Sequence, residues 1–394
     1  MKRFKHVIVG GGMAGASAAA GIREAGDQGS IALFGEETHA PYDRPPLSKA
    51  LWKGTPIESI WRKTAELGID LQLGLGIVAV DPGEKTLTDR NGTRYGYEKL
   101  LLATGGKPRR LPFETSSVIY YRTVDDYQRL RQIAREGTHV AVIGGGFIGS
   151  EIAAALAMNR VRVTMLFPDA SLGARIYPTG LSSFVERYYR DKGVTVLSGE
   201  SVNAIEQSGQ QTLVKTASGQ TVTADAVVAG LGLQLRTELA EAAGLQVNNG
   251  IQVDPFLHTS SSDIYAAGDA ANFYAPALDV RLRVEHEDNA NTMGKIAGGN
   301  MAGRNDRYDH LPFFYSDLFE LGYEAVGELD ARLETVEDWK EPFKKGVTYY
   351  LRDEQVRGVL LWNTWNQVDT ARQLIASKKR VSHSELIGRI TDEG

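Results

Sequence analysis

The sequence has no cysteine among its 394 residues. A redox disulfide, a cysteine sulfenate and a cysteine-ligated iron–sulfur cluster are therefore excluded from this chain. If the protein carries out redox chemistry, its electrons must move through a bound organic cofactor. We also expect no metal site.

Long apolar runs and an excess of basic residues are missing as well. No run approaches the roughly 20 residues of a membrane-spanning helix, so we expect no membrane span. The formal net charge is −5 and no basic face stands out, which argues against a nucleic-acid partner. Lys2, Arg3 and Lys5 precede glycines and not a signal-peptide core, so we expect a cytoplasmic protein.

The composition is that of a folded protein with more than one core. Hydrophobic residues make up 42% of the chain and charged residues 24%, as in globular proteins. A chain of 394 residues exceeds the size of one ordinary core, which predicts two or three domains.

A glycine-rich stretch near the N-terminus carries the first functional signal. Residues 7–9 are apolar and an alanine-rich segment follows the glycines, which predicts a strand, a tight turn and a helix. Gly10 would let the chain turn, Gly12 would let backbone N–H groups approach a pyrophosphate, and Gly15 would let the helix close onto the strand. The alternative is an ordinary tight turn. Glu36, about 20 residues further on, favours dinucleotide binding, because an adenosine ribose needs a hydroxyl acceptor there.

The same pattern occurs a second time. Residues 140–143 are an apolar run that ends at Gly144, Gly146 and Gly149 and precedes a predicted helix. Asp169 again lies about 20 residues after the glycines. Two copies of one architecture predict two dinucleotide sites, which is a stronger signal than either motif alone.

Further apolar runs end close to glycines. Strands are predicted to stop at residues 103–105 and at Gly230, as strands do where a backbone approaches a ligand closely. Residues 264–267 form a short apolar strand that ends in Gly-Asp ahead of small residues, which predicts a helix start. Asp269 either caps that helix or holds the hydroxyl groups of a cofactor.

The last part of the chain contains no phosphate loop. Residues 323–326, 346–351 and 356–362 predict antiparallel strands, and residues 368–377 predict a closing helix. We therefore treat residues 312–394 as a separate domain.

With these two glycine motifs and strand ends, the chain resembles the two-dinucleotide flavoprotein family that includes glutathione reductase. The resemblance implies that the first copy binds FAD, that the second binds NAD(P)H, and that Asp269 contacts the ribityl and pyrophosphate region of FAD. Disulfide-reducing members carry a cysteine pair after the first acidic residue. Residues 41–49, Pro-Tyr-Asp-Arg-Pro-Pro-Leu-Ser-Lys, instead resemble the branch of oxygenase-coupled ferredoxin reductases and apoptosis-inducing factor.

Within that branch, three stretches are more similar to apoptosis-inducing factor. They are residues 283–286, residues 314–318 with 322–325, and residues 358–363 with Ala371-Arg372. The resemblance is to a compact, prokaryotic type, because the long insertion of the mammalian C-terminal domain has no counterpart between residues 326 and 346. Two positions depart from the family pattern: Tyr315 stands where Trp is usual, and Leu235-Arg236 stands where Pro-Asn is usual.

Motifs and resemblance together predict an α/β protein with two Rossmann-like, glutathione reductase-like domains and a small α+β C-terminal domain. The FAD-binding domain would comprise residues 1–112 and 251–311. The NAD-binding domain would comprise residues 113–250. Residues 312–394 would form the C-terminal domain, an interface for dimerisation.

The resemblance places Lys49 and Glu151 as a pair at N5 of the flavin. At ~4 Å and an effective dielectric constant of ~20, such a pair attracts by about 4 kcal/mol. That energy keeps the lysine charged in a partly dry site, where it would stabilise an anionic reduced flavin. The residues alone favour simpler interpretations, an exposed lysine and a first-turn acid stabilised by the helix dipole.

Other residues are assigned around the flavin by the same resemblance. Phe147 would shield the nicotinamide face opposite the flavin, with core packing as the alternative. His286 and Glu285 would lie near the flavin and nicotinamide edge, the alternative for His286 being a hydrogen-bonded core histidine. Arg44 would lie near the FAD phosphates, and its alternative is a solvated loop arginine.

Two residues bear on the choice of nicotinamide cofactor. Asp169 suits a ribose 2′-OH and would repel a 2′-phosphate, which favours NADH over NADPH. Arg175 nearby moderates that preference. The predicted FAD set is Gly10, Gly12, Ala14, Gly15, Glu36, Arg44, Lys49, Ala103, Thr104, Gly105, Asp269, Glu285 and His286. The predicted NAD set is Gly144, Gly146, Phe147, Ile148, Gly149, Glu151, Asp169, Arg175 and Gly230, and the catalytic residues are Lys49, Glu151, Phe147 and His286.

The resemblance implies a FAD-dependent NADH:acceptor oxidoreductase, in which a hydride passes from NADH to flavin N5. In the first hypothesis the protein is similar to apoptosis-inducing factor, with a long-lived reduced flavin–NAD+ complex and signalling through a homodimer that depends on redox state. In the second it is the ferredoxin or rubredoxin reductase component of an oxygenase system. In the third it is an NADH-gated, redox-sensing binding module. The electron acceptor stays open between a ferredoxin, a quinone and O2.

Overall fold

The contacts within the chain divide it into two units. The computed structural model describes residues 1–113, 115 and 117–391. Unit 1 comprises residues 1–43, 57–107 and 234–312. Unit 2 comprises residues 44–56, 108–233 and 313–394.

Unit 1 is built on a seven-stranded sheet. The strands β1 (Lys2–Val9), β2 (Ile31–Phe34), β3 (Asp70–Gln72), β4 (Ile77–Asp81), β5 (Thr86–Asp89) and β6 (Arg94–Leu102) lie in the order β3-β2-β1-β6-β5-β4, and β18 (Ile264–Ala266) also pairs with β6. Strands β1, β2, β3, β6 and β18 run parallel, and Val7 lies opposite Ala32 and Leu100. All three of these side chains are fully buried, as an apolar run in a parallel sheet requires. The strand predicted at residues 7–9 is confirmed.

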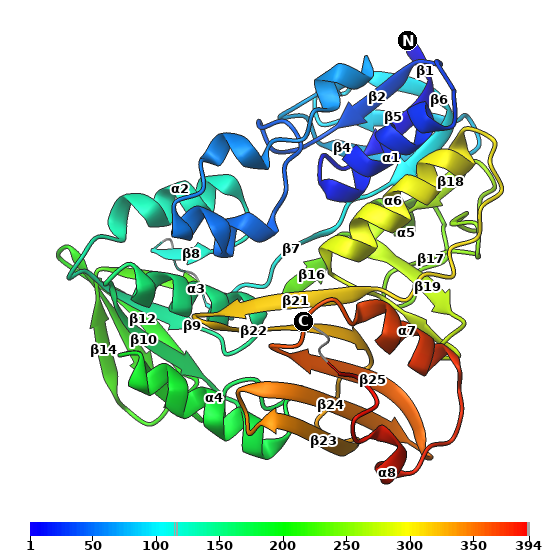
Figure 1. The fold of residues 1–394 in the computed structure, drawn as a ribbon. Helices are drawn as coiled ribbons and strands as arrows, with labels where there is room; N and C mark the ends of the chain where they lie inside the picture. The colour runs from blue at the N-terminus through cyan, green and yellow to red at the C-terminus, as the bar shows by residue number, and fades with distance from the viewer. Residues whose placement is uncertain (114, 116, 392–394) are drawn as a thin grey trace. The chain divides into compact units, whose positions relative to one another are not determined.

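Two helices of unit 1, α1 (Met13–Glu24) and α6 (Glu287–Met301), pack at very short range (Figure 1). A Cβ atom placed on Gly298 would lie 2.0 Å from the carbonyl oxygen of Ala18, and one on Gly294 would lie 2.3 Å from that of Ala14. On the facing helix, a Cβ on Gly21 would lie 2.2 Å from the carbonyl oxygen of Lys295. The glycines therefore let the two backbones touch, which holds the start of α1 in place.

The segment after β18 differs from the prediction. A helix was expected to start at Asp269, but only the 3-10 turn η5 (Gly268–Ala270) forms there, and the strand β19 (Ala271–Ala275) follows it. The prediction was wrong because small residues alone do not specify a helix. Ala271 has extended backbone dihedrals, and β19 pairs with β17 (Ile251–Gln252) and β20 (Val280–Leu282). Short helices η3 (Ile57–Ile60), η4 (Thr64–Leu67) and α5 (Glu238–Ala242) complete unit 1.

Unit 2 contains a second parallel sheet of the same kind. Strands β8 (Val118–Tyr120), β9 (His139–Ile143), β10 (Arg162–Phe167), β11 (Thr195–Ser198) and β15 (Ala226–Ala229) lie in the order β11-β10-β9-β15-β8. The helices α2 (Val124–Ile133), α3 (Phe147–Met158) and α4 (Thr179–Asp191) alternate with these strands. Strands β12 (Val202–Ser208), β13 (Gln211–Thr216) and β14 (Thr221–Ala224) form a separate antiparallel sheet. Between β11 and β12 the chain turns at Gly199, whose φ is 75°.

The rest of unit 2 is an antiparallel sheet with two helices. Strands β21 (Phe313–Leu318), β22 (Leu321–Gly327), β23 (Glu334–Glu341), β24 (Lys345–Arg352) and β25 (Gln355–Trp362) lie in the order β21-β22-β25-β24-β23. Helix α7 (Val368–Ala376) packs on β22 and β25, and α8 (His383–Leu386) follows it. The predicted strands and closing helix are confirmed, and β21 and β23 are additional to them.

Residues outside these sheets connect the parts of the chain. Strands β7 (Gly106–Pro108) and β16 (Leu233–Leu235) pair where the chain passes between the units. The 3-10 helices η1 (Pro45–Ser48) and η2 (Ala50–Lys53) belong to unit 2, and residues 234–250 belong to unit 1. The three-domain assignment by bound cofactor stays a prediction.

The contact between α1 and α6 gives a testable prediction. Gly298→Ala forces a methyl group against the Ala18 carbonyl, and such overpacking costs about 1–3 kcal/mol. That cost exceeds the roughly 1 kcal/mol that alanine gains over glycine in a helix. We expect a lower Tm, measured by thermal unfolding. Gly299→Ala is the matched control, because its Cβ would lie 3.2 Å from the flexible Arg304 side chain and no backbone is in the way. Equal Tm values for the two variants would contradict the prediction.

Candidate functional site

The first glycine loop has the shape of a phosphate cradle. Gly10 has a φ of 129°, and a Cβ there would lie 2.0 Å from the carbonyl oxygen of Ala103. A Cβ on Gly15 would lie 2.0 Å from the carbonyl oxygen of Gly10. At Gly12, by contrast, no atom of the described chain lies within 4 Å of the Cβ position. The loop is therefore closed against its own sheet and open at Gly12, as the approach of a pyrophosphate to the backbone requires.

The start of α1 also fits an anion. Gly12 is its N-cap residue, no side chain caps the helix, and no acidic residue lies in its first turn. Helix α2 is different, because the side chains of Thr123 and Asp126 form a capping box around its first N–H groups. Uncapped N–H groups and the positive end of the helix dipole together favour a phosphate. The residues of unit 1 therefore fit the pyrophosphate of FAD.

Other predicted FAD residues surround this loop within unit 1. A Cβ on Gly268 would lie 2.9 Å from the Cβ of Ala14, so the neighbouring Asp269 is close to the start of α1. The hydroxyl group of Thr104 donates a hydrogen bond of 2.6 Å to the carbonyl oxygen of Arg236. The carboxylate of Glu36 accepts a hydrogen bond from the guanidinium group of the same arginine.

The second glycine loop repeats this geometry in unit 2. Gly144 has a φ of 117°, and a Cβ there would lie 2.4 Å from the carbonyl oxygen of Gly230. A Cβ on Gly149 would lie 2.0 Å from the carbonyl oxygen of Gly144, whereas no described atom lies within 4 Å of the Cβ position of Gly146. A Cβ on Gly230 would lie 3.4 Å from the Cβ of Ile148. The second loop thus also fits a dinucleotide.

Phe147 and Ile148, at the start of α3, are partly exposed. Their exposed fractions are 37% and 40%, so core packing, the alternative for Phe147, is wrong. The ring of Phe147 contacts that of Phe314 edge to face, with a distance of 5.2 Å between the ring centroids. The contact holds an aromatic ring beside the open second loop.

Asp169 and Arg175 form an ion pair in unit 2. The Nε atom of Arg175 donates a hydrogen bond of 3.1 Å to Oδ1 of Asp169. The arginine side chain is 79% exposed and that of the aspartate 33%. The two residues predicted to bear on the choice between NADH and NADPH are therefore in direct contact.

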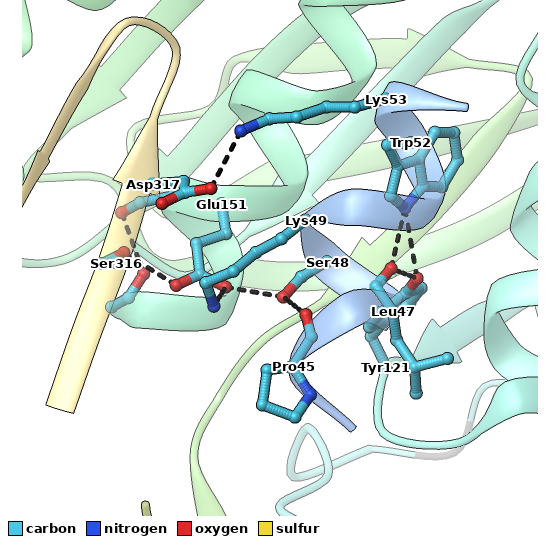
Figure 2. A network of polar contacts seen from close by, with 12 residues as sticks. Pro45, Leu47, Ser48, Lys49, Trp52, Lys53, Tyr121, Glu151, Ser316 and Asp317 are labelled. Carbon is cyan, nitrogen blue, oxygen red and sulfur yellow. Dashed lines mark hydrogen bonds and ion pairs between the residues drawn. The ribbon is translucent and has the colours of Figure 1, made fainter. Parts of the chain in front are cut away.

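Lys49 and Glu151 form the most buried ion pair of the predicted site (Figure 2). The Nζ atom of Lys49 donates a hydrogen bond of 2.7 Å to Oε2 of Glu151, and the two side chains are 11% and 3% exposed. The simpler interpretations, an exposed lysine and a first-turn acid stabilised by the helix dipole, are therefore wrong, because Lys49 is largely buried and no acidic residue lies in the first turn of α3. A carboxylate this buried is costly unless its oxygens are paired.

Two serines complete the bonding of Glu151, and the sequence did not indicate either. Ser48 donates to Oε2 at 2.6 Å, and Ser316 of β21 donates to Oε1 at 2.7 Å. The ring of Tyr315 lies beneath the lysine ammonium, 5.0 Å from Nζ to the ring centroid. Serine occurs too often in loops and strands to be recognised as a partner by its pattern. The one available signal was that Ser48 and Ser316 lie within residues 41–49 and 314–318, two segments that carry the resemblance.

The segment that carries Lys49 is held by hydrogen bonds within unit 2. The carbonyl oxygen of Leu47 accepts hydrogen bonds from Trp52 Nε1 at 2.8 Å and from the Tyr121 hydroxyl at 2.5 Å (Figure 2). Arg44, at the start of the segment, donates from Nη1 to the carbonyl oxygen of Arg122 at 3.0 Å. Its predicted proximity to the FAD phosphates stays a prediction.

The charge of Glu151 also affects buried tyrosines of unit 2. Burial, and to a smaller degree the carboxylate of Glu151, raise the pKa of Tyr177 and of Tyr189 above the ordinary value of a phenol. The same two causes, together with Tyr177, raise the pKa of Tyr323. The phenol groups of these three tyrosines are therefore harder to ionise than a phenol in water.

Glu285 and His286 lie in unit 1. His286 is the N-cap residue of α6, and Glu285 forms an ion pair with Arg283. Lys49, Glu151 and Phe147 lie in unit 2. Convergence of all these residues on one flavin ring stays a prediction.

In residues 1–113, 115 and 117–391, no helix is long and apolar enough to cross a membrane. Within the same residues, no group of three or more His, Asp or Glu side chains is placed to hold a metal ion.

Comparisons with known proteins agree with the geometry. A family model described as pyridine nucleotide-disulphide oxidoreductase matches residues 4–294, and one described as apoptosis-inducing factor, mitochondrion-associated, C-term, matches residues 297–342 and 337–377. The predicted resemblance and the α/β fold class with a C-terminal sheet domain are confirmed.

Relatives of both predicted types match along most of this chain. Apoptosis-inducing factor 1 of Dictyostelium discoideum is 32% identical and aligns with 97% of this chain and 80% of its own length. Putidaredoxin reductase of Pseudomonas putida is 33% identical and aligns with 94% of this chain and 92% of its own length. The crystal structure of the covalent putidaredoxin reductase–putidaredoxin complex has a TM-score of 0.91 and 32% identity, covering 98% of this chain and 95% of that chain.

The bonding of Glu151 generates a prediction about stability. Ser316→Ala leaves Oε1 of a buried carboxylate without its donor, which costs about 1–3 kcal/mol. We expect the free energy of unfolding, measured in urea, to fall by that amount. Ser377→Ala is the control, because that exposed hydroxyl bonds only to backbone groups, the Leu374 carbonyl and the Lys379 N–H, and solvent can replace it at both. A Ser316→Ala variant as stable as the control would show that this hydrogen bond contributes nothing.

Proposed function

We propose that this protein, which belongs to the pyridine nucleotide-disulphide oxidoreductase family, oxidises NADH in the manner of apoptosis-inducing factor. It would hold the reduced flavin with NAD+ as a long-lived complex. The family match over residues 4–294 makes it a FAD-dependent NAD(P)H oxidoreductase, with FAD and NADH as its cofactors. The finer points, which are the lifetime of the complex, the acceptor and the role of each residue, belong to the proposal.

The two glycine loops divide the cofactors between them in this proposal. The first loop and Asp269 would hold the pyrophosphate of FAD, with Glu36 at its adenosine ribose. The second loop would hold NADH, with Asp169 at the ribose 2′-OH, where its negative charge disfavours the 2′-phosphate of NADPH. Both loops have the open glycine that such binding needs.

FAD, when bound, supplies the hydride acceptor, and the protein supplies orientation and charge. Lys49 would stabilise the negative charge of the reduced flavin. Glu151 fixes the position of that lysine, since its own carboxylate is held by Ser48 and Ser316. Phe147, partly exposed at the second loop, would cover the nicotinamide and exclude water.

The single observation that carries the apoptosis-inducing factor type is where β21 lies. This strand supplies Ser316 to Glu151 and Tyr315 beneath Lys49, and it falls within the segment 297–342 that matches the apoptosis-inducing factor C-terminal model. The part of the chain typical of that type is thus in contact with the predicted catalytic pair. Dimerisation through the C-terminal domain, dependent on redox state, belongs to the same proposal.

A second candidate is the reductase component of an oxygenase system. The likeness to the putidaredoxin reductase structure, with its TM-score of 0.91, favours it. In that case a separate ferredoxin takes single electrons from the flavin. The Lys49–Glu151 pair would serve both candidate functions. The two candidates therefore differ in the electron acceptor and not in this pair.

Anaerobic titration with NADH separates the two candidates. We expect a long-wavelength charge-transfer absorbance and slow reoxidation when air is admitted, because NAD+ bound against the flavin hinders access by O2. Absence of the band together with reoxidation within milliseconds would contradict the proposal. Rapid reduction of a panel of ferredoxins would then establish the second candidate.

Substitution of the predicted catalytic lysine tests the role of the pair. Lys49→Ala removes the positive charge, so we expect flavin reduction by NADH to slow by about tenfold or more, equivalent to at least 1.4 kcal/mol in the barrier. The flavin potential should fall as well. Stopped-flow absorbance and a redox titration measure the two quantities.

The matched control for this substitution is Lys53→Ala in the same segment. Lys53 is 45% exposed and pairs with Asp317 at 2.8 Å, without contact to Glu151 (Figure 2). Flavin content and Tm report whether each variant is folded. A Lys49→Ala variant with the rate and potential of the control would remove Lys49 from the mechanism.

A further inference from the structure

Arg236 lies at a position where the chain departs from the family pattern. Its backbone is fixed on both sides: its N–H donates to the carbonyl oxygen of Gly105 at 3.0 Å, and its carbonyl oxygen accepts from the Thr104 hydroxyl at 2.6 Å. These bonds anchor the residue to the strand end that follows β6. A side-chain substitution would leave them in place.

From this anchor the guanidinium group of Arg236 reaches Glu36. Nη1 donates to Oε2 of the carboxylate, and within the described part of the chain no donor binds Oε1. The two side chains are 36% and 54% exposed. A pair this exposed contributes little to the stability of the fold. We therefore look for its role in ligand binding.

We propose that Arg236 is a positioning residue for the adenosine end of FAD. It holds Glu36 by one oxygen and leaves the other directed to a ribose hydroxyl group. It also offsets the negative charge that Glu36 adds near the pyrophosphate of the cofactor. The inference rests on the proposed binding of the FAD ribose by Glu36 and goes beyond it by adding a residue that the resemblance does not supply.

Charge and geometry both favour arginine in this role. The asparagine usual at this position is neutral and cannot offset the carboxylate. A guanidinium group binds a carboxylate in a fixed plane and stays charged at every working pH. With the carboxylate preoriented, less side-chain freedom is lost when FAD binds, and affinity rises for that reason.

The test measures how fast FAD leaves the purified holoenzyme, followed by the rise of flavin fluorescence after dilution. Arg236→Ala loses a charge-assisted hydrogen bond that orients Glu36, so we expect release to be about tenfold faster than in the wild type. Arg236→Lys keeps the charge without the planar geometry and should fall between the two. The family residue, in Arg236→Asn, should behave as alanine does.

Arg109→Ala is the matched control. The Nε atom of Arg109 donates to the carbonyl oxygen of Leu233, at the start of β16, at 2.9 Å. In the described part of the chain, Arg109 makes no contact with Glu36. Its FAD release should equal that of the wild type. Release from Arg236→Ala at the control rate would overturn the inference.

A double-mutant cycle with Glu36→Gln shows whether Arg236 acts through that carboxylate. In the Glu36→Gln background, we expect Arg236→Ala to change the rate of FAD release by less than about twofold, because two groups that act together lose their effect together. An undiminished effect would overturn the proposed route through Glu36. If Glu36→Gln alone leaves release unchanged, the ribose assignment fails and this inference with it. The NADH and acceptor chemistry is unaffected by either result, because no step of the measurement uses NADH.

Discussion

A buried carboxylate at Glu151 is the constraint on which the predicted site depends. Removing such a charge from water costs several kcal/mol unless donors replace the lost hydration. Here the donors come from two distant parts of the chain, Ser48 and Lys49 on one side and Ser316 on the other. The segment of residues 44–56 and the C-terminal strand β21 therefore have to be in place before the carboxylate is compensated. This explains why residues 44–56 belong to unit 2, although they precede the rest of it by many residues.

The two glycine loops are constrained by backbone contact and not by charge. A Cβ atom on Gly10 would lie 2.0 Å from a carbonyl oxygen and one on Gly144 would lie 2.4 Å from another, which is too close for any side chain. Both glycines also have φ values that only glycine reaches easily. Their geometry is so similar that it contains no information about which cofactor each binds. The assignment of FAD to the first loop and NADH to the second comes from the family. Each loop has the shape to bind a pyrophosphate, which both cofactors contain. Which of the two dinucleotides binds depends on residues further along the chain.

The sequence predicted those parts of the fold where the residue pattern is compatible with only one kind of secondary structure. Continuous apolar runs at residues 7–9 and 140–143 became buried parallel strands, and the glycines after them became tight turns. Small residues misled at residues 269–271, because they suit a helix, a 3-10 turn and a strand almost equally. Helix α6 was not predicted, since the glycines that let it touch α1 also weaken its helical pattern. Residues alone favoured an exposed Lys49, and the resemblance was needed to pair it with Glu151. Ser48 and Ser316 carry no pattern at all, because a serine becomes a specific donor only through what folds next to it.

The absence of cysteine and the saturation of Glu151 together limit how electrons leave the protein. With no thiol in the chain, no disulfide or sulfenate of this chain can accept electrons from the flavin. Both oxygens of Glu151 are occupied by the chain's own donors, which hold the carboxylate in one place. No thiol of this chain can pass electrons from the flavin to an acceptor. In the proposed function, the Lys49–Glu151 pair would set how readily the flavin is reduced, and access to the reduced flavin would set where the electrons go. A bound NAD+ that blocked this access would make the protein retain its electrons, so the two candidate functions would differ in that access and not in the pair.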